Sequence, residues 1–127
     1  MFKGLESVLL GSSNAKKLAE FYEKKVGLKL TTEAEMGEDN EALFGFELKG
    51  TSSFYVMDHS KVEGKSKDPS RIIINFEVND IDEAVKKLDA NKVKKVQDKY
   101  HLEGYGYIAT YEDIDGNYFQ VVQVRSK

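Results

Sequence analysis

The sequence predicts an α+β fold built from two βαβββ modules, and two observations predict it. First, a short apolar run, a turn and an amphipathic helix occur near the start of the chain, and the same order recurs from Ile72 onward. Second, each half then contains two β-rich runs around a glycine turn, at Gly50 and at Gly116. Because one supersecondary unit occurs twice, we expect a duplicated architecture.

The first module opens with a predicted strand over Leu5–Leu10, followed by a turn at Gly11-Ser12-Ser13. The next segment is predicted to be a helix from apolar residues at helical spacing, namely Ala15, Leu18, Ala19, Tyr22 and Val26. Gly27 ends this helix, because glycine readily adopts the left-handed conformation found just past many helix C-termini. The β-rich runs 42–47 and 53–57 complete the module.

The second module opens with a predicted strand over Ile72–Val78. Asp80, with Glu83 three residues later, is an acidic version of a capping box and predicts the start of a helix. The apolar positions of this helix are Ile81, Ala84, Val85 and Leu88. The β-rich runs 107–112 and 118–124 complete the module.

The two halves superpose at an offset of about 66 residues. This offset places Ser7 on Ile73, Asn14 on Asp80, Leu18 on Ala84, Tyr22 on Leu88, and the turn 47–51 on 113–117. We therefore expect one domain over 1–127, with module 1 at about 1–58, a polar connection at about 59–70 and module 2 at about 71–127.

Composition excludes several classes of function. A chain of 127 residues that is 40% hydrophobic and 32% charged has the balance of a globular domain rather than of a membrane protein or a disordered tail. A net charge of -3 argues against nucleic acid as a partner. The chain has no cysteine, which excludes disulfides and thiolate metal sites, and its N-terminus lacks the apolar segment of a signal peptide. We expect a cytoplasmic protein.

The residues Glu20-Phe21-Tyr22 and Val26-Gly27 resemble the opening of a glyoxalase/bleomycin-resistance module of the vicinal oxygen chelate superfamily. The segments 76–82 and 113–117 resemble the second-strand and final-hairpin patterns of the same family. This resemblance spans nearly the whole chain. It implies that the paired modules curl their sheets into a cup around a small ligand, with the helices on the convex side.

The resemblance also implies where a metal would bind, because metal-dependent members carry His, Glu or Gln on the first and last strands of each module. By the 66-residue offset these positions hold Ser7, Phe54, Ile73 and Gln120. Only Gln120 is a plausible ligand, so we expect no metal and no cofactor. A register error of one residue would exchange Phe54 for Tyr55, which is no standard ligand in this family either.

Ligand contacts are expected on the sheet face opposite the helices. Strand alternation puts Ile73, Asn75 and Glu77 on one face, and this mixed face suits a ligand, although an open face in contact with solvent is the simpler alternative. The resemblance places tyrosines in the walls and lid of the cup: Tyr100, Tyr105, Tyr107, Tyr111 and Tyr118. The loop 102–106 is either a mobile lid or an ordinary hairpin. The predicted ligand-binding residues are Ser7, Phe54, Ile73, Asn75, Tyr105, Tyr107 and Gln120, with Phe54 and Gln120 on opposite walls.

Three functions follow from the resemblance. The leading hypothesis is a metal-independent protein that binds an aromatic or cationic small molecule in a tyrosine-lined cup, similar to the antibiotic-sequestering members. The first alternative is a metal-dependent lyase, isomerase or dioxygenase of the glyoxalase type that uses His59, His101 and Gln120. The second is an interaction protein whose cup face is a dimer interface, since members of this family commonly form homodimers.

Overall fold

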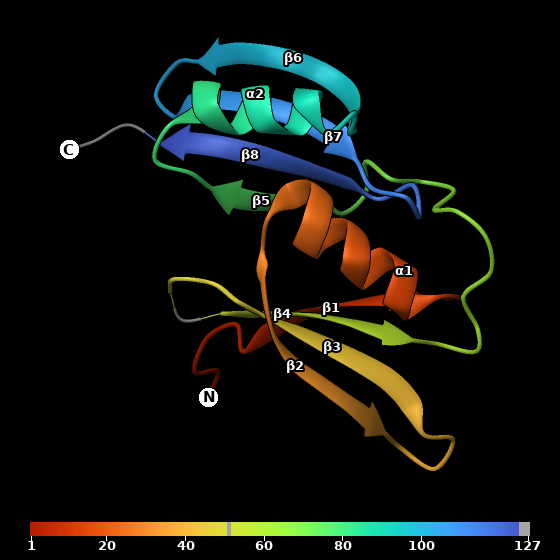
Figure 1. Cartoon of the computed structure of the whole chain (residues 1–127). Helices are drawn as coiled ribbons and strands as arrows, with labels where there is room; N and C mark the ends of the chain where they lie inside the picture. Colours follow the sequence, from red (N-terminus) through yellow and green to blue (C-terminus); the bar gives the residue numbers. More distant parts are fainter. Residues whose placement is uncertain (51, 125–127) are drawn as a thin grey trace. The chain divides into compact units, whose positions relative to one another are not determined.

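The computed structural model describes residues 1–50 and 52–124, which form two compact units, Met1–Gly64 and Lys65–Lys127. Each unit contains a four-stranded mixed sheet and a helix that packs on it (Figure 1). The boundary between the units lies inside the predicted connection 59–70. Thr51 of the predicted glycine turn and residues 125–127 of the second module lie outside the described residues.

The first unit has the order strand, helix, strand, strand, strand. Its elements are β1 (Ser7–Ser12), α1 (Ala15–Glu20), the π-helix η1 (Phe21–Val26), β2 (Lys29–Met36), β3 (Glu41–Glu47) and β4 (Ser53–Asp58). The strands are arranged β1-β4-β3-β2, with β1 parallel to β4 and the other neighbours antiparallel. This is the predicted βαβββ module.

Two side chains cap the start of the first helix, and a glycine ends it. Asn14 accepts a hydrogen bond from the Lys17 N–H, and Asp58 Oδ1 at the end of β4 accepts from the Ala15 N–H at 2.7 Å. Gly27 ends the helix with φ of 95°, as its sequence position predicts. Tyr22 lies in this helix and is fully buried between it and the sheet.

The second unit repeats the order of the first. Its elements are β5 (Ile74–Glu77), α2 (Ile81–Ala90), β6 (Lys94–Leu102), β7 (Gly106–Glu112) and β8 (Tyr118–Val124). The strands are arranged β5-β8-β7-β6, with β5 parallel to β8 and the other neighbours antiparallel. The predicted α+β fold of two βαβββ modules is therefore confirmed.

The start of α2 is held by two side chains. Asp80 accepts hydrogen bonds from the N–H groups of Asp82 and Glu83, as the capping pattern predicts. Gln123 Oε1 on β8 accepts from the Ile81 N–H at 2.9 Å and so ties the helix to the sheet. The strand β5 is shorter than predicted, because Ile72 lies before it and is 73% exposed.

The spacing between the two modules changes by one residue along the chain. The helix caps Asn14 and Asp80 are 66 residues apart, whereas Lys29 and Lys94, the first residues of β2 and β6, are 65 apart. The change falls where the first unit has its π-helix, whose turns hold more residues than those of an α-helix. The sequence offset of 66 therefore holds for the helices and misplaces the later strands by one residue.

No helix among residues 1–50 and 52–124 has the length and apolar character needed to cross a membrane.

Candidate functional site

Strand alternation gives each sheet one face that packs on its helix and one that does not, which we call the helix-free face. In the first unit Phe46 and Phe54 face the helix, because their rings pack edge-on against Tyr22 with centroids 6.4 and 5.1 Å away. Gly45 and Tyr55 are the next residues along β3 and β4 and are paired with each other. They therefore lie on the helix-free face.

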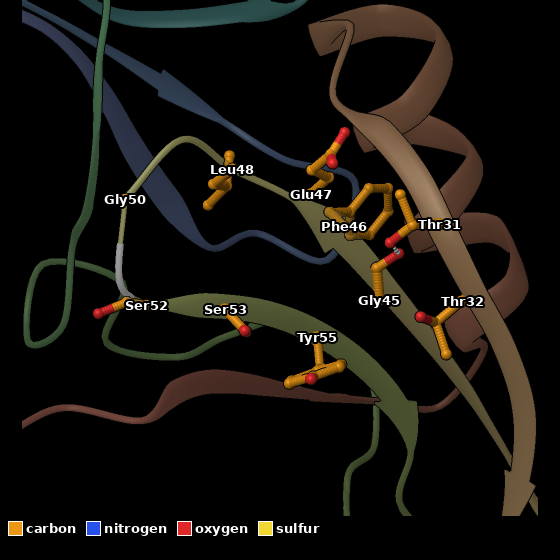
Figure 2. A pocket seen from close by; sticks show the side chains of 10 residues that line it. All are labelled: Thr31, Thr32, Gly45, Phe46, Glu47, Leu48, Gly50, Ser52, Ser53 and Tyr55. Carbon is orange, nitrogen blue, oxygen red and sulfur yellow. Dashed lines mark hydrogen bonds between the residues drawn. The ribbon is translucent and has the colours of Figure 1, made fainter.

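A pocket of about 260 Å³ lies over β2, β3, β4 and the turn between β3 and β4 (Figure 2). Its lining combines hydroxyl groups, one carboxylate and a tyrosine ring, from Thr31, Thr32, Gly45, Phe46, Glu47, Leu48, Gly50, Ser52, Ser53 and Tyr55. Such a lining offers a small molecule both hydrogen bonds and ring contact.

A β-bulge in β2 shapes this pocket. Leu30 pairs with Phe46 and Thr32 pairs with Gly45, so Thr31 is the extra residue and both threonines lie opposite Gly45. Thr31 Oγ1 donates a long hydrogen bond of 3.5 Å to the Gly45 carbonyl oxygen (Figure 2). The bulge thus brings two hydroxyl side chains to the pocket where a regular strand would bring one.

Polar contacts organise the rim of the pocket. Lys29 Nζ lies 3.2 Å from Glu47 Oε2, and both side chains are exposed. Ser52 Oγ donates to the Leu5 carbonyl at 3.1 Å, which ties the β3–β4 turn to the segment before β1. An exposed ion pair of this kind contributes little to stability, so the Glu47 carboxylate can exchange its partner for a cationic group of a ligand.

The helix-free face of the second unit carries a row of uncharged polar side chains. In register across the four strands, Asn75 pairs with Gln120, Gln120 with Thr110, and Thr110 with Gln97. Gln120 Nε2 donates to Thr110 Oγ1 at 2.9 Å. This row can offer amide donors and acceptors on one sheet face.

The corresponding row of the first unit has different chemistry. There the register across the sheet runs through Leu9, Tyr55, Gly45 and Thr32. The duplicated fold therefore presents a ring and a glycine in one module at the positions where the other module presents an amide and a threonine.

The predicted equivalence of Phe54 and Gln120 is wrong by one residue. Phe54 is 2% exposed on the helix-facing side, and its counterpart in the second unit is the fully buried Phe119. Gln120 corresponds to Tyr55 instead. The extra residue near η1 causes the error, and Phe54 packs in the core rather than against a ligand.

The predicted position of Tyr107 on the ligand-facing side is also wrong. Tyr107 pairs with Gln123, whose side chain bonds to the first turn of α2, so Tyr107 lies on the helix-facing side of the sheet. Tyr105 lies in the β6–β7 turn, where its N–H donates to the Leu102 carbonyl at 3.0 Å. The loop 102–106 therefore contains the turn of the β6–β7 hairpin, and its role as a lid stays a prediction.

The other predicted contacts lie on or beside the helix-free faces. Ser7 pairs with the pocket residue Ser53 on the first sheet. Asn75 and Gln120 are neighbours on the second sheet, and Ile73 is half-buried just before β5. Ligand binding by these residues stays a prediction.

His59 lies beside Gly11, at the end of the helix-free face of the first sheet, whereas His101 lies on the other side of the second sheet. His59 Nδ1 accepts a hydrogen bond from the Lys61 N–H at 3.1 Å in the loop after β4. The His101 ring contacts the Tyr107 ring at a tilt of 46°, with centroids 4.9 Å apart, on the helix-facing side of the second sheet. Because Gln120 lies on the opposite face of that sheet, His101 and Gln120 cannot ligate the same ion.

The positions at which the family resemblance places metal donors do not fit a metal ion. With the register corrected they hold Ser7, Tyr55, Ile73 and Gln120, and the Gln120 amide already donates to Thr110. Among residues 1–50 and 52–124, no three His, Cys, Asp or Glu side chains gather closely enough to hold a metal. One neutral amide and hydroxyl groups do not offset the dehydration of a divalent cation.

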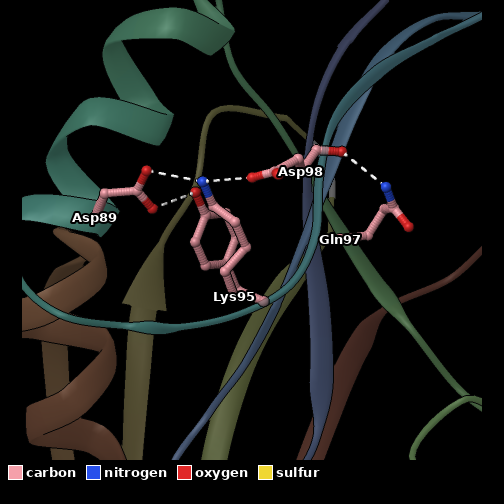
Figure 3. A network of polar contacts seen from close by, with 5 residues as sticks. Asp89, Lys95, Gln97 and Asp98 are labelled. Carbon is pink, nitrogen blue, oxygen red and sulfur yellow. Dashed lines mark hydrogen bonds and ion pairs between the residues drawn. The ribbon is translucent and has the colours of Figure 1, made fainter.

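A polar network outside this site joins α2 to β6. Asp89 Oδ2 and Asp98 Oδ1 lie 2.8 and 2.9 Å from Lys95 Nζ (Figure 3). The Tyr111 hydroxyl, buried beneath Lys95, donates to Asp89 Oδ1 at 3.0 Å. Lys95 lowers the pKa of the Asp89 carboxyl, while burial and then the bond to Asp89 raise the pKa of Tyr111. Lys95 and Tyr111 are paired on the helix-facing side of the sheet, so the network lies away from the helix-free face.

Comparison with known families agrees with this fold. The family model described as the Glyoxalase/Bleomycin resistance protein/Dioxygenase superfamily matches residues 4–121. The chain therefore belongs to this superfamily, and the resemblance noted in its sequence is confirmed. No curated protein sequence matches the chain.

Solved structures share the fold at low sequence identity. A glyoxylase/bleomycin resistance protein/dioxygenase domain from Frankia sp. EAN1pec has 16% identity and a TM-score of 0.77, with 98% of this chain and 100% of that chain covered. TnmS3, an antibiotic binding protein from Streptomyces sp. CB03234, has 19% identity and a TM-score of 0.77, with 98% of each chain covered. The fosfomycin resistance protein FosX from Listeria monocytogenes has 15% identity and a TM-score of 0.72, with 98% of this chain and 96% of that chain covered.

Sequence reasoning missed most of the pocket, including Thr31, Thr32, Gly45 and Glu47. One signal was present: Gly45 interrupts the β-rich run 42–47, and glycine inside a strand often marks a bulge or a close approach of another group. The bulge itself left no comparable signal, since Thr31 and Thr32 are ordinary strand residues.

Proposed function

We propose that this protein binds a small organic molecule, without a metal ion, in the pocket on the helix-free face of its first unit. The observation that carries the proposal is the pocket of about 260 Å³, whose lining joins the Tyr55 ring to the hydroxyls of Thr31 and Thr32 and the Glu47 carboxylate. The side chains at the family's metal-binding positions, Ser7, Tyr55, Ile73 and Gln120, do not favour a metal-dependent reaction.

The lining favours an aromatic or cationic ligand. The face of the Tyr55 ring attracts flat rings and cations, and Glu47 is the charged residue among the described lining residues. Lys29 is the present partner of Glu47, at 3.2 Å and exposed to solvent, so a cationic ligand competes with a weak contact.

Structural relatives support a binding role. TnmS3 is described as an antibiotic binding protein, and FosX as a fosfomycin resistance protein. Both share the fold of this chain, and members of one fold differ in their ligands through the side chains of the site. We therefore propose that sequestration of a small molecule, rather than its chemical conversion, is the activity of this chain.

The test is a thermal-shift screen against aromatic cations, aromatic anions and neutral aromatic compounds, followed by calorimetry on the compounds that bind. Any compound that binds the native state raises the unfolding midpoint by mass action. Tyr55→Ala is expected to weaken binding about tenfold or more, in line with the loss of a well-packed aromatic contact. The matched control is Tyr107→Ala, which removes a 40% exposed tyrosine from the helix-facing side of the second unit and leaves affinity unchanged.

Two results would overturn the proposal: no compound binds the folded wild type, or Tyr55→Ala and Tyr107→Ala bind equally well while both remain folded.

A second candidate function is an interaction protein that forms a homodimer. Tyr100, Leu102 and Val124 favour it, because they lie on the helix-free face of the second sheet and are 41%, 46% and 39% exposed. Gly106 lies between Leu102 and Val124 in the register, so the two apolar side chains flank a residue that has no side chain. Light scattering should then give twice the chain mass of 14.4 kDa for the wild type and 14.4 kDa for Leu102→Asp. A monomeric wild type would exclude this candidate.

A further inference from the structure

We infer that Gly45 is a positioning residue: it makes room for the Tyr55 ring beside β3, and so keeps the pocket open for a planar ring ligand. This inference rests on the proposed function for the ligand, while the placement of the ring can be tested without any ligand.

Space, not backbone conformation, accounts for glycine at this position. Gly45 is not among the residues with positive φ, so its backbone would accept any L-amino acid. A Cβ atom at position 45 would lie 2.8 and 3.0 Å from Cε1 and Cδ1 of Tyr55, and 3.1 Å from Cβ of Thr32. The ring therefore occupies the volume that a side chain at position 45 would need.

A side chain at position 45 has no free space on the side away from the ring. Thr32 lies on the other side of Gly45, and the bulge that brings Thr31 and Thr32 to this point narrows the space around the glycine. A side chain at position 45 would push the ring of Tyr55 outward, into the pocket that both residues line.

The second unit provides an internal comparison. Thr110 occupies the position that corresponds to Gly45, and Gln120 the position that corresponds to Tyr55. There the side chain of Thr110 is accommodated and accepts a hydrogen bond from Gln120 Nε2 at 2.9 Å. The βαβββ module itself therefore does not require glycine at this point of its third strand; the tyrosine ring does.

Glycine inside a strand lowers stability relative to residues with a side chain, so a compensating role is expected. The ring lies against the sheet, its exposed face lines the pocket, and a flat ligand can stack on it. The inferred ligand class is a planar aromatic ring system, with a cationic or donor group within reach of Glu47.

The first experiment is a double-mutant cycle on thermal stability. Gly45→Ala is expected to lower the unfolding midpoint by several degrees in the wild-type background, because the new Cβ collides with the ring. In the Tyr55→Ala background the same change should leave the midpoint unchanged or raise it, since alanine is the better strand residue. If Gly45→Ala does not fold, the double variant Gly45→Ala/Tyr55→Ala should fold again.

Equal losses in both backgrounds, or a double variant that also fails to fold, would show that Gly45 does not accommodate Tyr55. Such a result would overturn the inference and leave the proposed function standing.

The second experiment measures binding of proflavine, a fluorescent planar aromatic cation, by fluorescence and calorimetry. Wild type and Tyr55→Phe should bind with similar affinity, because both retain the ring. Gly45→Ala and Tyr55→Ala should each bind about tenfold more weakly, and the double variant no more weakly than Tyr55→Ala.

If the stability cycle comes out as expected but neither proflavine nor other planar compounds bind the wild type, the inferred ligand class is rejected and the placement of the ring by Gly45 is retained. Full affinity in a folded Gly45→Ala protein would overturn the positioning role in binding.

Discussion

Tyr111 is a fully buried tyrosine on β7 whose hydroxyl donates to Asp89 Oδ1 at 3.0 Å. A buried hydroxyl is stabilising only when it has a partner, and the Asp89 carboxylate on α2 provides one. The bond therefore joins the helix to the sheet, with the tyrosine ring buried and the Asp89 carboxylate at the edge of the contact partly exposed to solvent.

We predict that Tyr111→Phe lowers the free energy of unfolding by about 1 kcal/mol, the usual net value of such a hydrogen bond. The ring packing of Tyr111 on Phe119, with centroids 6.0 Å apart, is retained in this variant. Urea unfolding measures the loss, with Tyr105→Phe in the exposed β6–β7 turn as the control that should not change stability. Equal stability of the two variants would mean that the Asp89 contact is not made in solution.

Asp89 makes the stability of the second unit depend on pH. The hydrogen bond from Lys95, supported by that from Tyr111, holds the pKa of the Asp89 carboxyl below its ordinary value of 3.8. A carboxyl whose pKa is lower in the folded protein than in the unfolded chain stabilises the fold. This stabilisation is complete at pH values above the pKa of the unfolded chain, and it is lost as the pH falls through the pKa of the folded protein. The contribution is small, because Asp89 is 43% exposed and solvent screens its charge.

We therefore predict that the difference in stability between wild type and Asp89→Asn is largest above about pH 5 and shrinks toward about pH 2. Urea melts across this range measure it. A difference that stays constant or grows on acidification would contradict the lowered pKa.

At the scale of the element, α2 is held to its sheet by a narrow apolar face. Ile81 and Leu88 are each 2% exposed, whereas most other residues of the helix are polar. Burial of such a face, more than helix propensity, stabilises a helix of this length.

We predict that Leu88→Ala costs about 2–5 kcal/mol of unfolding free energy, because it removes buried methyl groups and leaves a cavity. Lys86→Ala, on the exposed side of the same helix, should stay within about 0.5 kcal/mol of wild type. Denaturant melts that show the same small change for both variants would mean that the helix face is assigned wrongly.

The two helices also differ in a way that changes which residues of the two units correspond. The first is completed by the π-helical turn η1, and the second is α-helical throughout. The additional residue in the first unit changes the spacing of the repeat from 66 to 65 before β2 and β6 begin. As a result, Tyr55 rather than Phe54 corresponds to Gln120 on the helix-free faces.

For the whole molecule, the side chains at the family's metal-binding positions lead to a prediction about the metal content of the purified protein. Purified protein should contain well below one zinc, nickel or manganese ion per chain, because Ser7, Tyr55 and Ile73 stand where strong donors would be needed. Elemental analysis without added chelator, together with titration by the three metals, measures this. About one bound ion per chain, lost on His101→Ala, would favour the enzymatic alternative.

Much of the architecture could be predicted because its signals are local. Asp80 followed by Glu83 marks a helix start, Gly27 marks a helix end, and alternating apolar residues mark the strands. Repetition of these signals at a nearly constant spacing was enough to predict two βαβββ modules. The positions of the candidate site residues could be predicted only in part. Asn75 and Gln120 lie together on a helix-free face, as expected, whereas Phe54 and Tyr107 each lie on the helix-facing side of their sheet.

The sequence by itself thus determined the kinds of elements, their order and their duplication, because caps, turns and periodicity act over a few residues. Only the tertiary structure decided which side chains meet at the pocket. A strand alternates its side chains with a period of two, so an error of one residue in the spacing of the repeat assigns Phe54, in place of Tyr55, to the helix-free face. Packing that no local pattern records puts Tyr55 at the pocket beside Gly45 and Phe54 in the core.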